Sequence, residues 1–346
     1  MESTLEELRP REIVVHRTWR DIYFATILLV VIIAMANLAT YFYLEDHLFT
    51  PDRWLFQGKW RILQELEKPT DWIVLGDSSG AWGIARDVFE EGISGNSVNL
   101  STAGDTTLVN DAWMLQNYIE RFGPPKGVLA IQTIMSLNAR MRELIATNTP
   151  LEYGYWERYK PAASFDFYRK LHFVLNRYFP LYTQTQNLHP RKMRQYGRFR
   201  NRSEISSNGY IEWENSNPKK VAFQVMRRRR RVNRRKLRLS KDNHKALKAI
   251  GRMSEKYGFD FYLAAAPVCR LAPQDEGYRK THAQLYDTIE ELFLSWKRLH
   301  LVLREPMTFP KDEMQNQDHL IYEAAKRYTW RVTNLVKLSR VRNDKH

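Results

Sequence analysis

The stretch Trp72-Ile73-Val74-Leu75-Gly76-Asp77-Ser78-Ser79-Gly80 decides the fold of this 346-residue chain. Four apolar residues run into a turn that contains glycine and serine, which is the pattern of a buried strand that ends in a tight turn. A helix is predicted directly after it, over 81–91. The segment therefore predicts the strand–turn–helix unit with which an α/β domain begins.

The same alternation continues on both sides of a long middle segment. Further strands are predicted at 97–100, 127–134, 259–266 and 300–303, and helices at 54–68, 106–121, 241–257, 278–299 and 320–338. Gly258 follows one of these helices and suits its C′ position. Short apolar strands that alternate with helices indicate a parallel sheet covered on both faces. We therefore expect an α/β fold of three layers, with a doubly wound parallel five-stranded sheet and a helical insertion over 139–240.

An uncharged apolar segment precedes the α/β pattern. Residues 22–44 carry no charge, and a helix of this length reaches about 34 Å, enough for a hydrocarbon core of about 30 Å. The run is longer than the apolar part of a signal peptide and ends in Tyr41-Phe42-Tyr43, which suits a membrane interface. More arginines precede the segment than cations follow it, where Arg53 and Lys59 stand. This balance favours a cytoplasmic N-terminus and an extracytoplasmic domain.

These patterns divide the chain into five segments. They are a cytoplasmic tail (1–21), a transmembrane helix (22–44), a linker helix (45–69), an α/β domain (70–338) with a basic, aromatic-rich insertion (139–240), and a C-terminal tail (339–346). The chain has one cysteine, Cys269, so it cannot form an intramolecular disulfide. We find neither a phosphate-binding glycine loop nor a cluster of metal-ligand residues in the sequence, and expect no cofactor and no metal.

Positive charge is concentrated in the insertion. The net charge of the chain is +15, and the run Arg227–Arg238 holds nine basic residues and no acidic one. Such a run is either a solvated helix face or a site for an anionic ligand. A polyanionic glycan, a phosphate-bearing polymer and lipid head groups are the ligands it favours, and nucleic acid is the least favoured.

Ser78 stands where a parallel sheet places its chemistry, because such sheets form their sites at the carboxyl ends of strands. A serine hydroxyl needs a base to become a nucleophile, and His319 in Asn316-Gln317-Asp318-His319-Leu320, before the last helix, is the candidate. Structural interpretations compete with this one. Ser78 or Asp77 can cap the helix, His319 can face solvent, and Gly104 can supply a left-handed turn.

Three segments together resemble the SGNH (GDSL-like) hydrolase superfamily. They are Gly76-Asp77-Ser78-Ser79, Asn99-Leu100-Ser101-Thr102-Ala103-Gly104 and Asp318-His319-Leu320, in the order and positions of the superfamily's first, second and last motifs. With its N-terminal anchor, the chain is similar to the membrane-bound proteins of alginate O-acetylation and of teichoic acid D-alanyl transfer. The resemblance implies a flavodoxin-like sheet of SGNH type and a serine acyltransferase or esterase. It further implies an envelope polysaccharide or polymer as substrate, a membrane acyl-transfer partner, and a place in the bacterial inner membrane.

The resemblance also implies roles for single residues. Ser78 would be the nucleophile and His319 the base, and the backbone amides of Ser78 and Gly104 would form the oxyanion hole, with Asn138 as a further candidate. The superfamily places an aspartate three residues before the histidine, where this chain has Asn316, while Asp318 adjoins the histidine. Both residues stay open as the group that orients His319.

Two other functions are compatible with the same sequence. The asparagine at 316 and the segment 132–138, which lacks a clear third motif, favour a non-catalytic binding or assembly component of a polysaccharide or secretion machine. The run Arg227–Arg238 favours a membrane-tethered polyanion binder, whose affinity would fall with salt.

Overall fold

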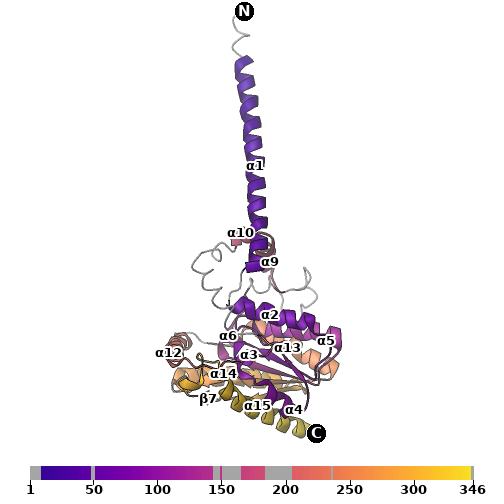
Figure 1. The fold of residues 1–346 in the computed structure, drawn as a ribbon, viewed down its shortest axis with the longest axis vertical. Helices are drawn as coiled ribbons and strands as arrows, with labels where there is room; N and C mark the ends of the chain where they lie inside the picture. Colours follow the sequence, from indigo (N-terminus) through magenta and orange to yellow (C-terminus); the bar gives the residue numbers. More distant parts are fainter. Residues whose placement is uncertain are drawn as a thin grey trace, which may run out of the picture.

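The computed structural model describes residues 9–47, 51–142, 149, 165–183, 205–234 and 237–343. The first helix, α1 (Arg9–His47), projects from the rest of the molecule as a long rod (Figure 1). Its segment Trp19–Phe42 is long and apolar enough to cross a membrane, and its large apolar side chains are exposed. A core helix of a soluble protein would bury such side chains, so this segment has the length, composition and exposure of a helix that can span a membrane.

Five parallel strands form the centre of the α/β part. They are β1 (Trp72–Gly76), β2 (Ser97–Asn99), β3 (Gly127–Gln132), β4 (Asp260–Ala265) and β6 (Leu299–Leu303). The strand order is β2-β1-β3-β4-β6, and each neighbouring pair is parallel. β1 and β3 are buried along their whole length, as strands covered on both faces must be. The expected five-stranded parallel sheet is confirmed.

Helices cover the sheet in two layers (Figure 1). On one side α5 (Thr107–Phe122) packs against α13 (Lys241–Tyr257), and α2 (Pro51–Glu65) packs against α5. On the other side α15 (Tyr322–Asn343) packs against α4 (Arg86–Ile93). A further helix, α14 (Glu276–Phe293), contacts β6. This arrangement leaves the carboxyl ends of the strands at one edge, where the chemistry of such sheets is found.

The insertion is helical where the structure describes it. It contributes α9 (Phe167–Tyr178), α10 (Pro180–Thr183) and α12 (Pro218–Arg234). Parts of the expected insertion, tails and linker lie outside the described residues, at 1–8, 48–50, 143–148, 150–164, 184–204, 235–236 and 344–346. α12 packs against α14, so this part of the insertion belongs to the α/β unit.

The local structure differs from the sequence predictions in two places. The helix expected over 81–91 is two helices, α3 (Ser78–Gly83) and α4, because Ile84 and Ala85 adopt extended backbone angles. The N–H of Ala85 donates to Oγ1 of Thr329 on α15 at 2.9 Å instead of continuing a helix. The second difference is a small parallel sheet of β5 (Val268–Cys269) and β7 (Thr308–Phe309), two residues each, which the sequence did not predict.

Candidate active site

The turn after β1 is built so that Ser78 stands at the first position of α3. Gly76 has a φ of +124°, and a Cβ on it would overlap the carbonyl oxygen of Ile131 on β3, so only glycine fits there. The N–H of Asp77 donates to that same carbonyl at 3.0 Å and ties the turn to β3. Ser78 is half-buried, with its side chain at the carboxyl edge of the sheet.

Asp77 caps α3, and Ser78 does not. One carboxylate oxygen of Asp77 accepts from the N–H of Ser79 at 2.9 Å, and the other accepts from the N–H of Thr133 at 2.8 Å. Asp77 is buried, and burial together with the negative charge of Asp318 raises its pKa. The interpretation of Asp77 as a cap is confirmed, while that of Ser78 as the N-cap is wrong.

His319 meets Ser78 across 241 residues of sequence. Its Nε2 lies 2.9 Å from Oγ of Ser78. The loop that carries it is pinned by an antiparallel bridge between Met314 and Leu320. The ring stacks on Trp82 of α3, with centroids 4.5 Å apart and planes at 17°. The side chain is 12% exposed, so the interpretation of His319 as solvent-facing is wrong.

Burial decides the charge of His319. It lowers the pKa of the imidazole to about 4, although the carboxylate of Asp318 acts in the opposite direction. The ring is therefore neutral at pH 7. A neutral imidazole can accept a proton, which a general base requires, but one with so low a pKa is a weak base.

Asn316, rather than Asp318, contacts the far nitrogen of the ring. Nδ2 of Asn316 lies 2.7 Å from Nδ1 of His319, and its Oδ1 accepts from the N–H groups of Asp318 and His319 at 2.9 and 2.8 Å. Asp318 lies on the opposite side of the ring, with Oδ1 at 3.8 Å from Nε2. Of the two candidates, the structure brings Asn316 to the orienting position.

Asp318 is instead paired with an arginine of the insertion. Its Oδ2 lies 2.6 Å from Nη2 of Arg228 on α12, and the two side chains are 8% and 12% exposed. Burial alone would raise the pKa of Asp318, but the charge of Arg228, aided by His319, outweighs burial and lowers it. A carboxylate–guanidinium pair therefore stands beside the Ser78–His319 pair, close to Nε2.

Sequence reasoning missed Arg228 and Trp82 as parts of this site. Arg228 was read only as one member of the run Arg227–Arg238. Its position in the sequence does hold a signal. Three buried valines of α12 lie on the same helix face as Arg228, seven residues before it (Val221), three before it (Val225) and four after it (Val232). An arginine on the apolar face of a helix points inward and needs a buried partner.

The oxyanion candidates differ in their placement. Gly104 lies beside the cap, since a Cβ built on it would be 3.8 Å from Cβ of Asp77, and its φ is not left-handed, so the interpretation as a left-handed turn is wrong. Asn138 ends the short helix α6 (Ile134–Asn138), and its side-chain amide donates to the carbonyl of Arg238 at 2.8 Å. That amide is engaged with the insertion.

A buried carboxyl lies in the layer beneath the site. Asp111 on α5 has no exposed surface, and its Oδ2 accepts from Nε2 of Gln132 at 2.8 Å. Burial, with the charge of Asp77, raises the pKa of Asp111 to about 8. Asp111 is therefore largely protonated at neutral pH and contributes little charge to the site.

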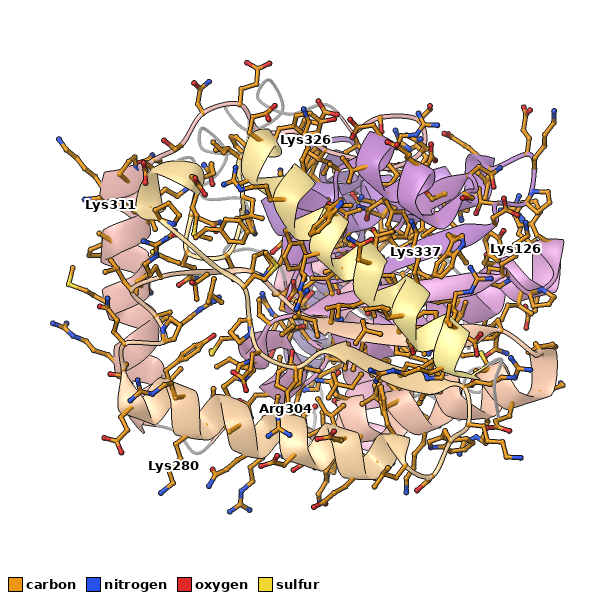
Figure 2. The ribbon with its side chains drawn as sticks, turned by 90° about the horizontal axis from the view of Figure 1, so that it is seen from below. Lys126, Lys280, Arg304, Lys311, Lys326 and Lys337 are labelled. Carbon is orange, nitrogen blue, oxygen red and sulfur yellow. The ribbon has the colours of Figure 1, made fainter. Side chains whose placement is uncertain are left out.

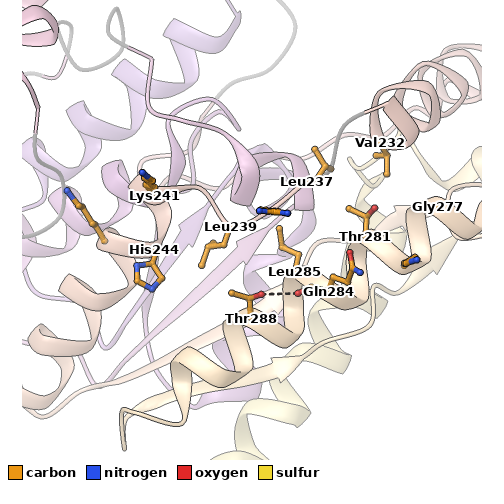
Figure 3. A pocket seen from close by; sticks show the side chains of 13 residues that line it. Val232, Leu237, Leu239, Lys241, His244, Gly277, Thr281, Gln284, Leu285 and Thr288 are labelled. Atoms are coloured by element: carbon orange, nitrogen blue, oxygen red, sulfur yellow. Dashed lines mark hydrogen bonds between the residues drawn. The ribbon is translucent and has the colours of Figure 1, made fainter.

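A separate cavity of about 1140 Å³ opens between the ends of α12, α13 and α14 (Figure 3). Cationic side chains at its wall include Arg238, Lys241 and Lys280, and apolar ones include Leu237 and Leu285. Lys280 also projects outward from α14 (Figure 2). Ser78 and His319 are not among the lining residues, so this cavity is distinct from their site. Within the described part of the chain no three His, Cys, Asp or Glu side chains gather as a metal site would require.

No protein family model matches the chain, and no curated protein matches it either.

Proposed function

We propose that this chain is a membrane-anchored serine acyltransferase or esterase with Ser78 as nucleophile and His319 as base. The observation that carries the proposal is the 2.9 Å contact between Oγ of Ser78 and Nε2 of His319 at the carboxyl edge of the sheet. A serine hydroxyl at hydrogen-bond distance from an imidazole, which a third side chain holds from behind, is the arrangement of an activated nucleophile.

The reaction uses the described groups in turn. Oγ of Ser78 attacks the ester carbonyl while its proton passes to Nε2 of His319, in the fraction of molecules whose imidazole carries its own proton on Nδ1. The N–H groups of Ser78 and Gly104 stabilise the oxyanion, a role in which one donor contributes about 2.7–4 kcal/mol. The intermediate collapses to acyl-Ser78, and the leaving alcohol takes the proton from His319. A hydroxyl of the acceptor, or water, then attacks acyl-Ser78 and gives its proton to Nε2 of His319. His319 passes that proton to Oγ of Ser78 as the acyl–Oγ bond breaks and the acylated acceptor, or the free acid, leaves.

The proposal includes an SGNH-type, flavodoxin-like fold. The order β2-β1-β3-β4-β6 corresponds to the doubly wound order 2-1-3-4-5 of flavodoxin-like sheets. The glycine-aspartate-serine turn after β1 and the aspartate-histidine pair before α15, which carry the resemblance, meet at one point in space. This meeting supports membership in the SGNH superfamily, which sequence order alone could only suggest.

We place the enzyme in the bacterial inner membrane, with the α/β domain outside the cytoplasm and an envelope polysaccharide or polymer as substrate. α1 supports the anchor.

The burial of Lys59 strengthens the comparison of positive charge on the two sides of the apolar segment. Lys59 is fully buried and donates to the carbonyl of Asn99 at 2.8 Å, so it is not a surface cation near the membrane. The excess of positive charge on the N-terminal side is larger than the sequence count suggests. A membrane acyl-transfer partner would supply the acyl group.

A non-catalytic binding or assembly role is the second candidate, and one observation favours it. An asparagine amide, not a carboxylate, contacts Nδ1 of His319, and it stabilises an imidazolium less than a carboxylate does. A polyanion-binding role would use the exposed Arg227 and Arg230 of α12. Binding of an acidic polysaccharide that weakens with salt and with Arg227→Met/Arg230→Met, but not with Ser78→Ala, would favour that role.

The test is labelling of the full chain in detergent with a fluorophosphonate probe. Wild type is expected to label, Ser78→Ala to lose the label, and His319→Ala to label much more slowly. Ser79→Ala is the matched control, because Ser79 is the neighbouring serine but is fully buried. If folded wild type does not label, or if Ser78→Ala labels equally, Ser78 is not the nucleophile and the binding role leads.

A further inference from the structure

The orientation of the Asn316 amide follows from two backbone donors. Its Oδ1 accepts from the N–H groups of Asp318 and His319, so its Nδ2 is the atom that faces Nδ1 of His319 at 2.7 Å. An amide nitrogen can only donate a hydrogen bond. Nδ1 must therefore accept, and the proton of the neutral ring is on Nε2.

This tautomer reverses the hydrogen bond of the Ser78–His319 pair. With its proton on Nε2, His319 donates to Oγ of Ser78 across the 2.9 Å contact, whereas a general base must accept there. The carboxylate of Asp318, 3.8 Å from Nε2 and ionised by its pairing with Arg228, also favours a proton on that nitrogen. The stacked ring of Trp82 holds the imidazole plane in this orientation.

We propose that Asn316 holds His319 in the Nε2–H tautomer and thereby keeps Ser78 weakly nucleophilic. The effect on catalysis rests on the proposed function, but the tautomer does not. Asn316→Asp is nearly isosteric, so one carboxylate oxygen can keep both backbone bonds while the other accepts from Nδ1–H. That change leaves Nε2 free to take the serine proton. The reverse change, aspartate to asparagine, lowers turnover about 10⁴-fold in a serine protease triad by setting the wrong tautomer. We therefore expect Asn316→Asp to speed labelling of Ser78 by about 10²–10⁴-fold.

The test reads the tautomer directly, by nitrogen NMR of the full chain in lipid bilayers with ring-¹⁵N histidine. The chain has nine histidines, and His319→Gln identifies the signals of interest. Nδ1 is expected to be unprotonated and Nε2 protonated in wild type, with the reverse in Asn316→Asp. A protonated Nδ1 in wild type overturns the inference.

Labelling rates separate this inference from the proposed function. If wild type labels at Ser78 as fast as Asn316→Asp, the tautomer does not limit Ser78, and the inference fails while the proposed function stands. If the tautomers are as expected but neither protein labels, the assignment of Asn316 holds and the proposed function fails.

A second, independent observation concerns α9 and α10 at the foot of α1 (Figure 1). Nδ2 of Asn37 donates to the carbonyl of Tyr178 at 2.6 Å, and its Oδ1 accepts from the N–H of Leu181 at 3.2 Å. Asn37 stands five residues before Phe42, where the apolar span ends. Five residues of helix rise about 8 Å, so these contacts lie at the depth of the apolar span.

The two faces of α9 differ in what they contact. Phe173 is buried, and its ring lies 4.8 Å from that of Phe165 in an edge-on contact within the α/β core. Phe167, Leu171 and Tyr178, at helical spacing on the other face, are 74%, 41% and 48% exposed. Two more aromatic side chains are exposed just after them, Phe179 and Tyr182. The exposed apolar face of α9 and α10 therefore adjoins the exposed apolar surface of α1, which lipid would cover in a membrane.

We propose that the exposed face of α9–α10 lies in the bilayer interface and holds the α/β domain against the membrane. Amphipathic helices of this kind bury their apolar face about 5–10 Å into the boundary between head groups and acyl chains, which matches the depth set by Asn37. Tyrosine and phenylalanine suit that boundary. The core contacts of Phe173 would transmit this anchoring to the domain that carries Ser78.

A fluorophore on a single cysteine tests the proposal in the full chain in lipid bilayers. The background is Cys269→Ala, with Tyr182→Cys on the proposed face and Leu294→Cys as control, because Leu294 is 85% exposed on the α/β domain. An environment-sensitive dye at 182 is expected to be quenched by spin-labelled lipid and protected from aqueous iodide, and the dye at 294 to behave in the opposite way. Equal iodide quenching at both positions overturns the proposal. Protection from iodide at 182 without quenching by spin-labelled lipid overturns it too, because protein rather than lipid would then cover the face.

Discussion

Replacing Arg228 by methionine removes the cation that faces the buried carboxylate of Asp318. The two groups lie 2.6 Å apart and are 12% and 8% exposed, so solvent cannot replace the lost partner. Breaking a buried ion pair on one side costs about 3–5 kcal/mol, because the remaining charge stays buried and unpaired. We expect Arg228→Met to lower the free energy of unfolding by about that amount at pH 7.5. Arg227→Met, at the exposed neighbouring position, should change it by less than about 0.5 kcal/mol.

The loss should depend on pH with a definite sign. In wild type the pKa of Asp318 is lowered, so its contribution is present above the unfolded pKa of about 3.9 and is lost as pH falls through the folded value. Without Arg228 burial dominates and raises that pKa. The folded variant then holds a proton that the unfolded chain has released, so its stability falls as pH rises through this window. The destabilisation relative to wild type should therefore be smaller near pH 5 than at pH 7.5.

Denaturant unfolding of the full chain in detergent, followed by tryptophan fluorescence at both pH values, measures this prediction. The double variant Arg228→Met/Asp318→Asn should recover much of the stability, because no buried charge is left. A loss below about 1 kcal/mol at pH 7.5, equal to that of Arg227→Met, would refute a buried, paired Asp318.

Three further predictions follow from single positions. Gly76→Ala should not yield folded protein, because the added Cβ overlaps the Ile131 carbonyl. Gly123→Ala is the control: its φ is +81° but the Cβ enters open space, so the free energy of unfolding should fall by only about 1–2 kcal/mol. Expression yield and thermal unfolding compare the two variants. In wild type, the free energy of unfolding should fall as pH rises from about 4 to 8, because Asp111 keeps its proton in the folded chain and releases it in the unfolded chain; Asp111→Asn should remove this fall. Denaturant unfolding at several pH values measures it, and the same dependence of unfolding free energy on pH in both proteins would exclude the raised pKa. Trp82→Leu should slow probe labelling of Ser78 while the chain stays folded, because the His319 ring loses its stacking partner; an unchanged rate would mean that packing does not orient the ring.

Elements with strong local signals were predictable from the sequence. The helix 241–257 was predicted with its observed bounds, because Ser240 caps it and Gly258, at φ +80°, ends it. The apolar run after residue 71 was likewise recognisable as a buried strand. Capping and apolar patterning act within a few residues, so one sequence contains them.

Features that depend on distant contacts were not predictable. The break between α3 and α4 depends on a hydrogen bond from Ala85 to Thr329, 244 residues away. The pairing of Asp318 with Arg228 joins the insertion to the site, and neither segment indicates the other. The choice between Asn316 and Asp318 was open because Asn316 stands three residues before His319 and Asp318 directly before it, and only the loop conformation decides which one reaches Nδ1.

Trapping of an acyl-enzyme tests the central claim most directly. The full chain is mixed with an activated acetyl ester, quenched in acid and digested, and the peptide that carries Ser78 is examined by mass spectrometry. The account predicts one acetyl group on Ser78, accumulating faster in Asn316→Asp than in wild type, and none on that peptide in Ser78→Ala. Folded protein whose Ser78 peptide stays unmodified in both wild type and Asn316→Asp would contradict the claim that this serine is a nucleophile.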